Sequence, residues 1–204
     1  AQYGMQKGKT GLQVVGDKNP HYALYIPRLH KLFPQAKFVH LVRDPRDTVL
    51  SYQKVNFDAN NARVLAYRWL RYNQAIEKAK QQTGAPFFSL RYEDLLQQPQ
   101  NSLEALCRFL GVSYHPQMLE FYKQGQDWEA SFRANLKKPL DPKHAYQWKT
   151  KMDSPTQKAV NRIVAPLAGT YHYELPEKRQ PPTLQDKSCG LYAAWVEMLE
   201  RLIY

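Results

Sequence analysis

The stretch Lys37-Phe-Val-His-Leu-Val-Arg-Asp-Pro-Arg-Asp-Thr-Val-Leu-Ser51 is the most informative part of this sequence. Residues 37–42 are mostly apolar and predict a buried strand, because they leave little polar surface for a solvated face. Asp44 and Pro45 follow, a pair typical of a helix start: the aspartate can accept from the first free amides, and the proline has no N–H to leave unpaired. The stretch therefore predicts a strand that ends at Arg43 and a helix that begins directly after it.

Strands and helices alternate along the rest of the chain. Residues 12–15 predict a short strand, which leads through a polar loop into a helix that ends near Leu32. Further helices are predicted over 62–82, 102–110, 155–167 and 191–203, a third strand over 85–90, and an ordered but irregular basic segment over 128–155. This alternation predicts an α/β fold, in which helices cover both faces of a parallel sheet and ligands gather at the carboxyl ends of the strands.

The composition fits one globular domain with an attraction for anions. The 204 residues are 43% hydrophobic, which is enough for a single core. Lys and Arg number 29 against 18 Asp and Glu, and the formal charge of +11 attracts polyanions such as nucleotides, nucleic acids or sulfated glycans. Cys107 and Cys189 stand far apart, so neither a disulfide framework nor a metal site is expected. No stretch approaches the about 20 apolar residues of a membrane helix, and we expect a cytoplasmic protein.

The C-terminal part forms a separate region in this interpretation. We expect the α/β domain over residues 1–175, and a linker with a C-terminal amphipathic helix over residues 176–204. The predicted helix has an apolar stripe, made of Leu191, Ala194, Trp195, Met198, Leu199 and Leu202. Packing of this stripe against the domain is the default expectation, and contact with a second copy or another partner is the alternative.

Arg43 and Ser51 form the strongest candidate site. A guanidinium group at a strand end, beside the positive end of a helix, is a ready place for a phosphate. Ser51 lies two turns beyond Asp44 on the same helix face, so its hydroxyl can add a donor. The segment resembles the 3'-phosphate-binding motif of sulfotransferases that use 3'-phosphoadenosine-5'-phosphosulfate, in which an Arg at the strand end and a Ser eight residues later hold the 3'-phosphate. The resemblance points to the bacterial and tyrosylprotein branches and covers about residues 12–125 best.

This resemblance implies a P-loop-like three-layer sandwich and gives roles to other residues. Lys18, in Gly16-Asp-Lys-Asn-Pro20, matches the family lysine that contacts the phosphosulfate, and His21 is the candidate base for the acceptor. Tyr92 matches a tyrosine that approaches the adenine, while Lys137 and Lys138 match a basic loop that closes over the nucleotide. A structural or solvated role is the alternative for each of these five residues.

The resemblance also implies the reaction and its partners. A sulfuryl group would pass from 3'-phosphoadenosine-5'-phosphosulfate to a hydroxyl of a small molecule, glycan or peptide, leaving 3',5'-adenosine bisphosphate. Neither a metal nor a nucleic-acid partner is expected. The family's first strand and its glycine-rich 5'-phosphosulfate loop have no counterpart before Leu12, so we expect the chain to lack them.

Two other functions remain open at this point. Residues 4–10, Gly-Met-Gln-Lys-Gly-Lys-Thr, imitate the P-loop of nucleotide kinases, although the first glycine stands one residue too close and no strand precedes it. The second alternative is a non-catalytic module that binds a polyanion or a 3'-phosphonucleotide through the +11 charge.

Overall fold

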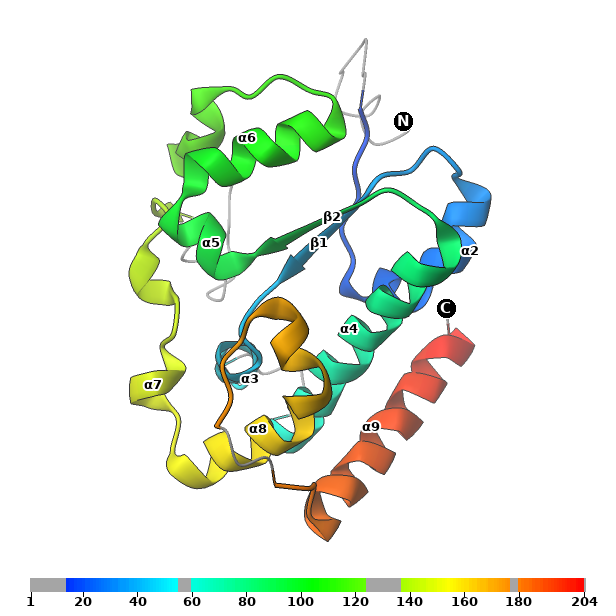
Figure 1. The fold of residues 1–204 in the computed structure, drawn as a ribbon, viewed down its shortest axis with the longest axis vertical. Coiled ribbons are helices and arrows are strands. Elements are labelled where there is room, and N and C mark those ends of the chain that lie inside the picture. Colours follow the sequence, from blue (N-terminus) through cyan, green and yellow to red (C-terminus); the bar gives the residue numbers. More distant parts are fainter. Residues whose placement is uncertain (1–13, 55–59, 124–136, 177–179, 204) are drawn as a thin grey trace.

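The centre of the protein is a parallel pair of strands, β1 (Phe38–Val42) and β2 (Phe87–Arg91). The computed structural model describes residues 14–54, 60–123, 137–176 and 180–203, with side chains as far as Met198. β1 runs directly into α3 (Pro45–Tyr52) and β2 into α5 (Tyr92–Gln97), as Figure 1 shows. Because the strands are parallel, both strand-to-helix junctions lie at the same edge of the sheet. Both strands and the helix after Asp44 were predicted from the sequence, and the structure confirms them.

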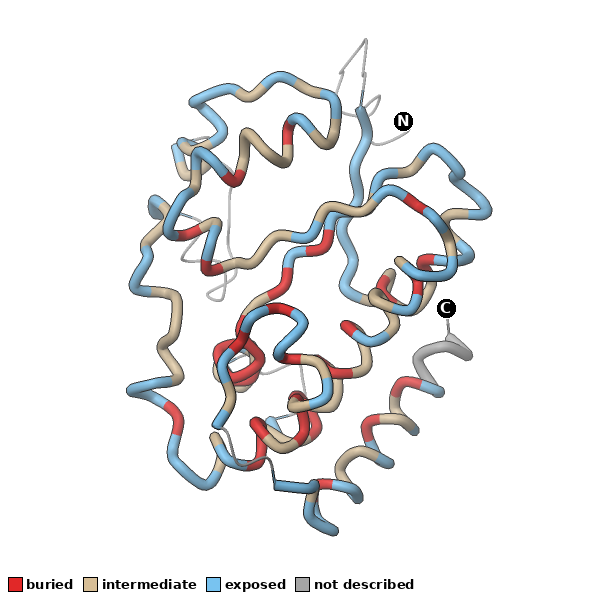
Figure 2. The backbone as a smooth tube through the Cα atoms, in the orientation of Figure 1, coloured by how far each residue is buried: buried red, intermediate tan, exposed pale blue. Residues whose placement is uncertain are grey.

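One face of this sheet is covered by α4 (Ala62–Thr83), where the His40 ring of β1 lies 2.9 Å from the Asn73 side chain. α4 packs in turn on α8 (Ser154–Ala168), and both helices pack on α3. Asn61 caps α4 by accepting from the amides of Arg63 and Val64, and Gly84 ends it with a positive φ of 62°. Most buried residues lie where α3, α4 and α8 meet (Figure 2). The core there includes Val42, Val49, Leu65, Trp69, Val160 and Ile163.

The opposite face carries α6 (Pro99–Leu110). The rings of Phe88 and Phe109 stack with centroids 5.5 Å apart, and the ammonium of Lys37 donates to the last carbonyls of α6 at 2.8 and 3.0 Å. Helices thus lie on both sides of the sheet, as predicted for an α/β fold. This cover is incomplete, because Val39 and Leu41 of β1 are 46% and 52% exposed. Within the described residues, no strand pairs with the second edge of β1.

The N-terminal prediction was partly wrong. Leu12 and Gln13 lie outside the described residues, and Val14 and Val15 are exposed and belong to no strand, so a strand over 12–15 is not formed there. The single helix expected next is divided into a 3-10 turn, η1 (Pro20–Leu24), and α2 (Ile26–Leu32). Pro27 near the start of α2 explains the break, since proline has no N–H to bond the carbonyl four residues before it and so cannot continue a helix from η1.

The chain after α6 consists of short helical turns up to α8. These are η2 (Pro116–Lys123), η4 (Pro142–His144) and α7 (Trp148–Lys151), and η5 (Gly169–Tyr171) follows α8. The described part of 128–155 is therefore ordered and irregular, as expected.

The C-terminal helix differs from its prediction in length and orientation. α9 (Leu184–Ile203) begins well before Leu191, in the part expected to be a linker. A reciprocal cap explains this start: the Asp186 amide donates to the Thr183 hydroxyl, and the Thr183 amide donates to the Asp186 carboxylate. α9 packs on α4 (Figure 1), but the large apolar residues of its stripe as far as Met198 do not make the contact, since Leu191, Trp195 and Met198 are exposed. No helix in the described parts of the chain has the length and hydrophobicity needed to cross a membrane.

Candidate functional site

The two strand ends bring Arg43 and Tyr92 together. Val42 is in register with Arg91, so the residues that follow them emerge side by side at the carboxyl edge of the sheet. The guanidinium carbon of Arg43 lies 4.7 Å from the centroid of the Tyr92 ring. Trp69 on α4 fixes the backbone here, because its indole N–H donates to the Arg43 carbonyl at 3.0 Å. Two of the residues singled out in the sequence therefore share one site.

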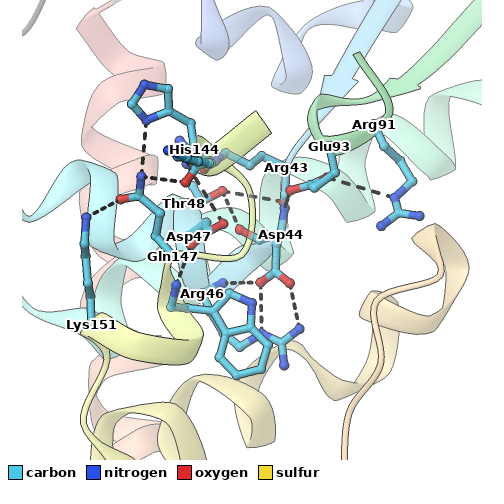
Figure 3. A network of polar contacts seen from close by, with 12 residues as sticks. Arg43, Asp44, Arg46, Asp47, Thr48, Arg91, Glu93, His144, Gln147 and Lys151 are labelled. Atoms are coloured by element: carbon cyan, nitrogen blue, oxygen red, sulfur yellow. Dashed lines mark hydrogen bonds and ion pairs between the residues drawn. The ribbon is translucent and has the colours of Figure 1, made fainter. Parts of the chain in front are cut away.

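Asp44 and Arg46 neutralise each other inside the protein. The Asp44 carboxylate accepts from the Arg46 amide and from Nε at 2.9 Å, and from Nη2 at 2.6 Å (Figure 3). The Arg46 guanidinium also stacks on the Trp148 ring at 3.6 Å. Since Asp44 is fully buried and Arg46 is 3% exposed, this pair holds the start of α3 in place and is not available to a ligand.

Glu93 joins three parts of the site. It is fully buried, and its two oxygens accept from the Asp44 amide and from the Tyr173 hydroxyl, each at 2.9 Å. Burial, and then the charge of Glu93, raise the pKa of Tyr173, so this phenol stays protonated and continues to donate. Glu93 thus fixes α3, α5 and the segment after α8 relative to one another.

Asp47 holds the segment after η4 against α3. Its Oδ1 accepts from the Trp148 amide at 2.8 Å, and its Oδ2 lies 4.0 Å from Arg43 Nη2. Burial raises the pKa of Asp47, while the Trp148 amide and the Arg43 charge oppose that rise. Arg43 reaches the same segment, since its Nη2 donates to the His144 carbonyl at 2.9 Å. Residues 144–148 therefore lie beside the Arg43 guanidinium, as the labelled side chains of Figure 3 show.

Arg43 and Arg91 keep part of their hydrogen-bonding capacity. Their nearest carboxylates are Asp47 at 4.0 Å for Arg43, and Asp94 at 3.9 Å and Glu93 at 4.0 Å for Arg91, which is too far for a strong charge-assisted bond. The Nε atoms of both are buried without a hydrogen-bond partner in the described part of the structure. Their side chains are 26% and 22% exposed. Two incompletely paired guanidinium groups at neighbouring strand ends can bind an anion such as a phosphate.

Ser51 lies on the same helix as this site. It occupies the last turn of α3 and is exposed, whereas Arg43 precedes the first turn. Its hydroxyl is therefore accessible to a ligand that extends along α3 from Arg43.

Lys18 and His21 lie on a second segment that also contacts α4. Asp17 orders this loop by accepting from the Lys18 amide at 2.8 Å and from the Tyr22 hydroxyl at 2.5 Å, and the Lys18 side chain is exposed. His21 Nδ1 is 3.1 Å from the Tyr72 hydroxyl. Tyr72 stands one turn after Trp69, which bonds the Arg43 carbonyl, so α4 connects this loop to the strand-end site.

Lys137 and Lys138 are exposed and come shortly before η4. Six residues after Lys138, the His144 carbonyl accepts from Arg43. The earlier part of this basic segment lies outside the described residues. Residues 4–10, the P-loop-like stretch, also lie outside the described residues, as would any 5' loop before Gln13.

The sequence interpretation missed the supporting residues. Arg91 was given no role, although the prediction of adjacent parallel strands could have placed it beside Arg43. Asp47 and Glu93 gave no clear signal, because an acidic residue in the first turn of a helix usually has an ordinary capping role. In the described parts of the chain, no cluster of three or more His, Cys, Asp or Glu side chains could hold a metal ion.

Comparisons with known proteins point to one family. The model of the sulfotransferase family matches residues 2–116. A putative protein-tyrosine sulfotransferase of Caenorhabditis briggsae is 30% identical over 112 residues, which are 52% of this chain and 40% of that protein. Omega-hydroxy-beta-dihydromenaquinone-9 sulfotransferase Stf3 of Mycobacterium tuberculosis is 29% identical over 131 residues, 56% of this chain and 34% of that protein. The chain therefore spans between a third and two fifths of the length of these curated relatives.

Two solved structures share the fold. The sulfotransferase domain from the curacin biosynthetic pathway superposes with a TM-score of 0.63 at 29% identity, covering 86% of this chain and 68% of that one. The sulfotransferase domain from the Synechococcus PCC 7002 olefin synthase gives a TM-score of 0.69 at 26% identity, covering 86% of this chain and 64% of that one.

Proposed function

The chain belongs to the sulfotransferase family, and on that premise we propose that it transfers the sulfuryl group of 3'-phosphoadenosine-5'-phosphosulfate to a hydroxyl acceptor. The second product is 3',5'-adenosine bisphosphate. We assign this activity to residues 1–175, with residues 176–204 as a linker and C-terminal helix. The acceptor is a small molecule, a glycan or a peptide.

The observation that carries this proposal is the position of Arg43. Its guanidinium stands at the carboxyl end of β1, faces the Tyr92 ring at 4.7 Å and keeps a buried Nε without a partner among the described residues. We assign the 3'-phosphate to Arg43 with the Ser51 hydroxyl, and the adenine to Tyr92, whose ring offers a stacking or edge contact. Lys137 and Lys138 would add positive charge from the exposed segment that leads to His144.

The reaction assigns separate tasks to Lys18 and His21. The acceptor oxygen attacks sulfur while the bond from sulfur to the 5'-phosphate oxygen breaks, and Lys18 stabilises the charge that builds on that leaving oxygen. His21 takes the acceptor's proton at Nε2. This requires the tautomer in which Nδ1–H donates to the Tyr72 oxygen, and the 3.1 Å separation of those atoms is compatible with it.

A nucleotide-binding experiment tests the phosphate assignment. We expect 3',5'-adenosine bisphosphate to raise the melting temperature of the full chain far more than adenosine 5'-phosphate does. Arg43→Ala should remove most of that difference, because a hydrogen bond to a charged group contributes about 1.5–3 kcal/mol. Arg108→Ala, which removes an exposed arginine of α6, is the matched control and should keep it. Equal stabilisation by both nucleotides would refute a 3'-phosphate site.

A separate assay tests the chemistry. Incubation of the full chain with 3'-phosphoadenosine-5'-phosphosulfate and pools of phenols, saccharides or tyrosine peptides should yield products heavier by one sulfuryl group, detected by mass spectrometry. His21→Asn should lower the rate of product formation and leave nucleotide affinity unchanged. Selective binding of the bisphosphate with no transfer to any pool would limit the function to nucleotide binding.

A further inference from the structure

Asp47 places a buried carboxylate beside the guanidinium that we assign to the 3'-phosphate. It lies in the first turn of α3 and is 1% exposed. Its Oδ1 accepts from the Trp148 amide at 2.8 Å, whereas its Oδ2 is buried without a hydrogen-bond partner among the described residues. Oδ2 lies 4.0 Å from Nη2 of Arg43 (Figure 3). The charge of Arg43 therefore favours the ionised form of Asp47 without a hydrogen bond between the two groups.

Other charges around Asp47 are paired with each other or carry the same sign. Asp44 and Arg46, at the start of the same helix, neutralise each other. Glu93 of α5 bonds the Asp44 amide and the Tyr173 hydroxyl. α4 and α8 also pack on α3, and the residues that these two helices bury are uncharged.

The segment that bonds Asp47 carries basic side chains with contacts of their own. These side chains are His144, Lys149 and Lys151. Gln147 contacts two of them, His144 at 3.2 Å and Lys151 at 2.7 Å, and Lys149 lies over the two aromatic rings of the segment. Among the ion pairs of the described residues, Asp47 has one partner, Arg43.

A phosphate on Arg43 acts on Asp47 in two ways that have the same direction. It brings negative charge close to the carboxylate, and it engages the guanidinium that had favoured ionisation. Water screens this interaction only weakly, because Asp47 is buried. In the absence of nucleotide, burial already raises the pKa of Asp47, while the Trp148 amide and the Arg43 charge oppose that rise. The bound phosphate should raise this pKa further.

We propose that Asp47 takes up a proton when the 3'-phosphate binds to Arg43, and so makes nucleotide binding depend on pH. The proton comes from the solvent and forms an O–H bond at Oδ2, while Oδ1 continues to accept from the Trp148 amide. This inference rests on the proposed function, because it requires the 3'-phosphate at Arg43. Asp47 is then a positioning residue whose charge limits the affinity for the nucleotide at neutral pH.

Nucleotide affinity should fall as the pH rises through the range in which Asp47 ionises. Each unit by which the pKa of Asp47 rises on binding corresponds to a loss of affinity of about tenfold between the protonated and the ionised limits. The ionisation of the phosphate itself, with a pKa of about 6, has the opposite effect, because Arg43 prefers the doubly charged form. A variant that cannot ionise at position 47 separates the two effects.

Asp47→Asn is that variant, because asparagine keeps an oxygen for the Trp148 amide and carries no charge. Titration calorimetry of the full chains with 3',5'-adenosine bisphosphate gives the dissociation constant between about pH 5.5 and 8. At the upper limit, Asp47→Asn should bind roughly three- to tenfold more tightly than the natural chain, and the difference should shrink towards the lower limit. Titrations at about pH 7 in two buffers of different ionisation enthalpy should show a larger proton uptake by the natural chain than by the variant.

Two further variants assign the proton to Asp47. Asp94→Asn removes a carboxylate that is 51% exposed and lies 3.9 Å from Arg91, so it is the matched control and should change the affinity less than about twofold at every pH. His144→Gln removes the titratable side chain of the residue whose carbonyl bonds Arg43, and should keep the proton uptake of the natural chain. Loss of the uptake in His144→Gln would assign the proton to the imidazole and overturn the inference.

Two other results would overturn the inference and leave the proposed function standing. One is selective binding of the bisphosphate with the same proton uptake by the natural chain and Asp47→Asn. The other is binding by Asp47→Asn that is weaker by the same factor at every pH, as expected if Asp47 only holds the segment in place. Should Asp47→Asn not fold, a lack of proton uptake by both the natural chain and His144→Gln would be decisive against the inference. Equal affinity for the bisphosphate and adenosine 5'-phosphate would refute the 3'-phosphate site, and the inference with it.

Discussion

The guanidinium of Arg43 and the ring of Tyr92 face each other at 4.7 Å across the ends of two neighbouring parallel strands. This contact predicts that Tyr92 supports nucleotide binding in two ways, by orienting the arginine and by offering a ring to the adenine. Tyr92→Leu should weaken binding of 3',5'-adenosine bisphosphate roughly tenfold or more, since cation–π and base-stacking contacts contribute about 1–3 kcal/mol. Titration calorimetry measures the change. Tyr92→Phe keeps the ring and should bind within about threefold of the natural chain; an equal loss in both variants would contradict a role for the ring.

Glu93 should contribute more to the free energy of unfolding than an exposed acidic residue does. Glu93→Ala leaves the Asp44 amide and the Tyr173 hydroxyl buried without their acceptor, and unsatisfied buried groups cost about 1–3 kcal/mol each. We expect the free energy of unfolding in urea to fall by roughly 2–5 kcal/mol. Glu93→Gln keeps an acceptor oxygen and should lose less. Glu120→Ala removes an exposed ion pair with Lys123 and should cost under about 1 kcal/mol.

The low pKa of His40 predicts that the protein loses stability in mild acid. Burial, and then the charge of Lys80, lower the pKa of His40 from 6.5 to about 4, so the folded protein resists a proton that the unfolded chain accepts. Stability should therefore fall as the pH decreases from about 6.5 towards 4, by roughly 2–3 kcal/mol in total. His40→Gln should flatten this part of the profile of unfolding free energy against pH. A profile of the same slope in both proteins would contradict the assignment.

The low pKa of Asp186 predicts a second loss of stability at lower pH. Burial alone would raise its pKa, but hydrogen bonds from Arg162, Thr183 and Arg63 lower it from 3.8 to about 2. The stability that the ionised Asp186 contributes is fully present above about pH 4. It is lost as the pH falls through about 2, because Asp186 is then protonated in the folded protein as well as in the unfolded chain. Asp186→Asn should destabilise the protein by roughly 2 kcal/mol above pH 4 and progressively less below it. Unfolding curves at several pH values would show whether the difference narrows in that range.

The strand ends could be predicted because local signals determine them. Residues 37–45 combine an apolar run with an Asp-Pro helix start, and the structure forms β1 and α3 there. Parallel pairing of two such strands then places Arg43 beside Tyr92, so this pair was predictable from the sequence.

The supporting contacts could not be predicted, because they join residues far apart in the chain. His144 meets Arg43 and Trp148 meets Asp47 across 101 positions, and no local pattern specifies either contact. The orientation of α9 was missed for a related reason. Its apolar stripe indicated a buried face, whereas distant arginines on α4 and α8 bind its charged face instead.

The uncovered face of β1 has a practical consequence for handling the protein. Val39 and Leu41 are about half exposed on a β-strand, and exposed apolar strand residues promote association between copies. Aggregation should therefore increase with the concentration of the sample. A lysine at either position should extend the usable concentration range for crystallisation or NMR, because a charge on an exposed strand opposes its association with a strand of another copy.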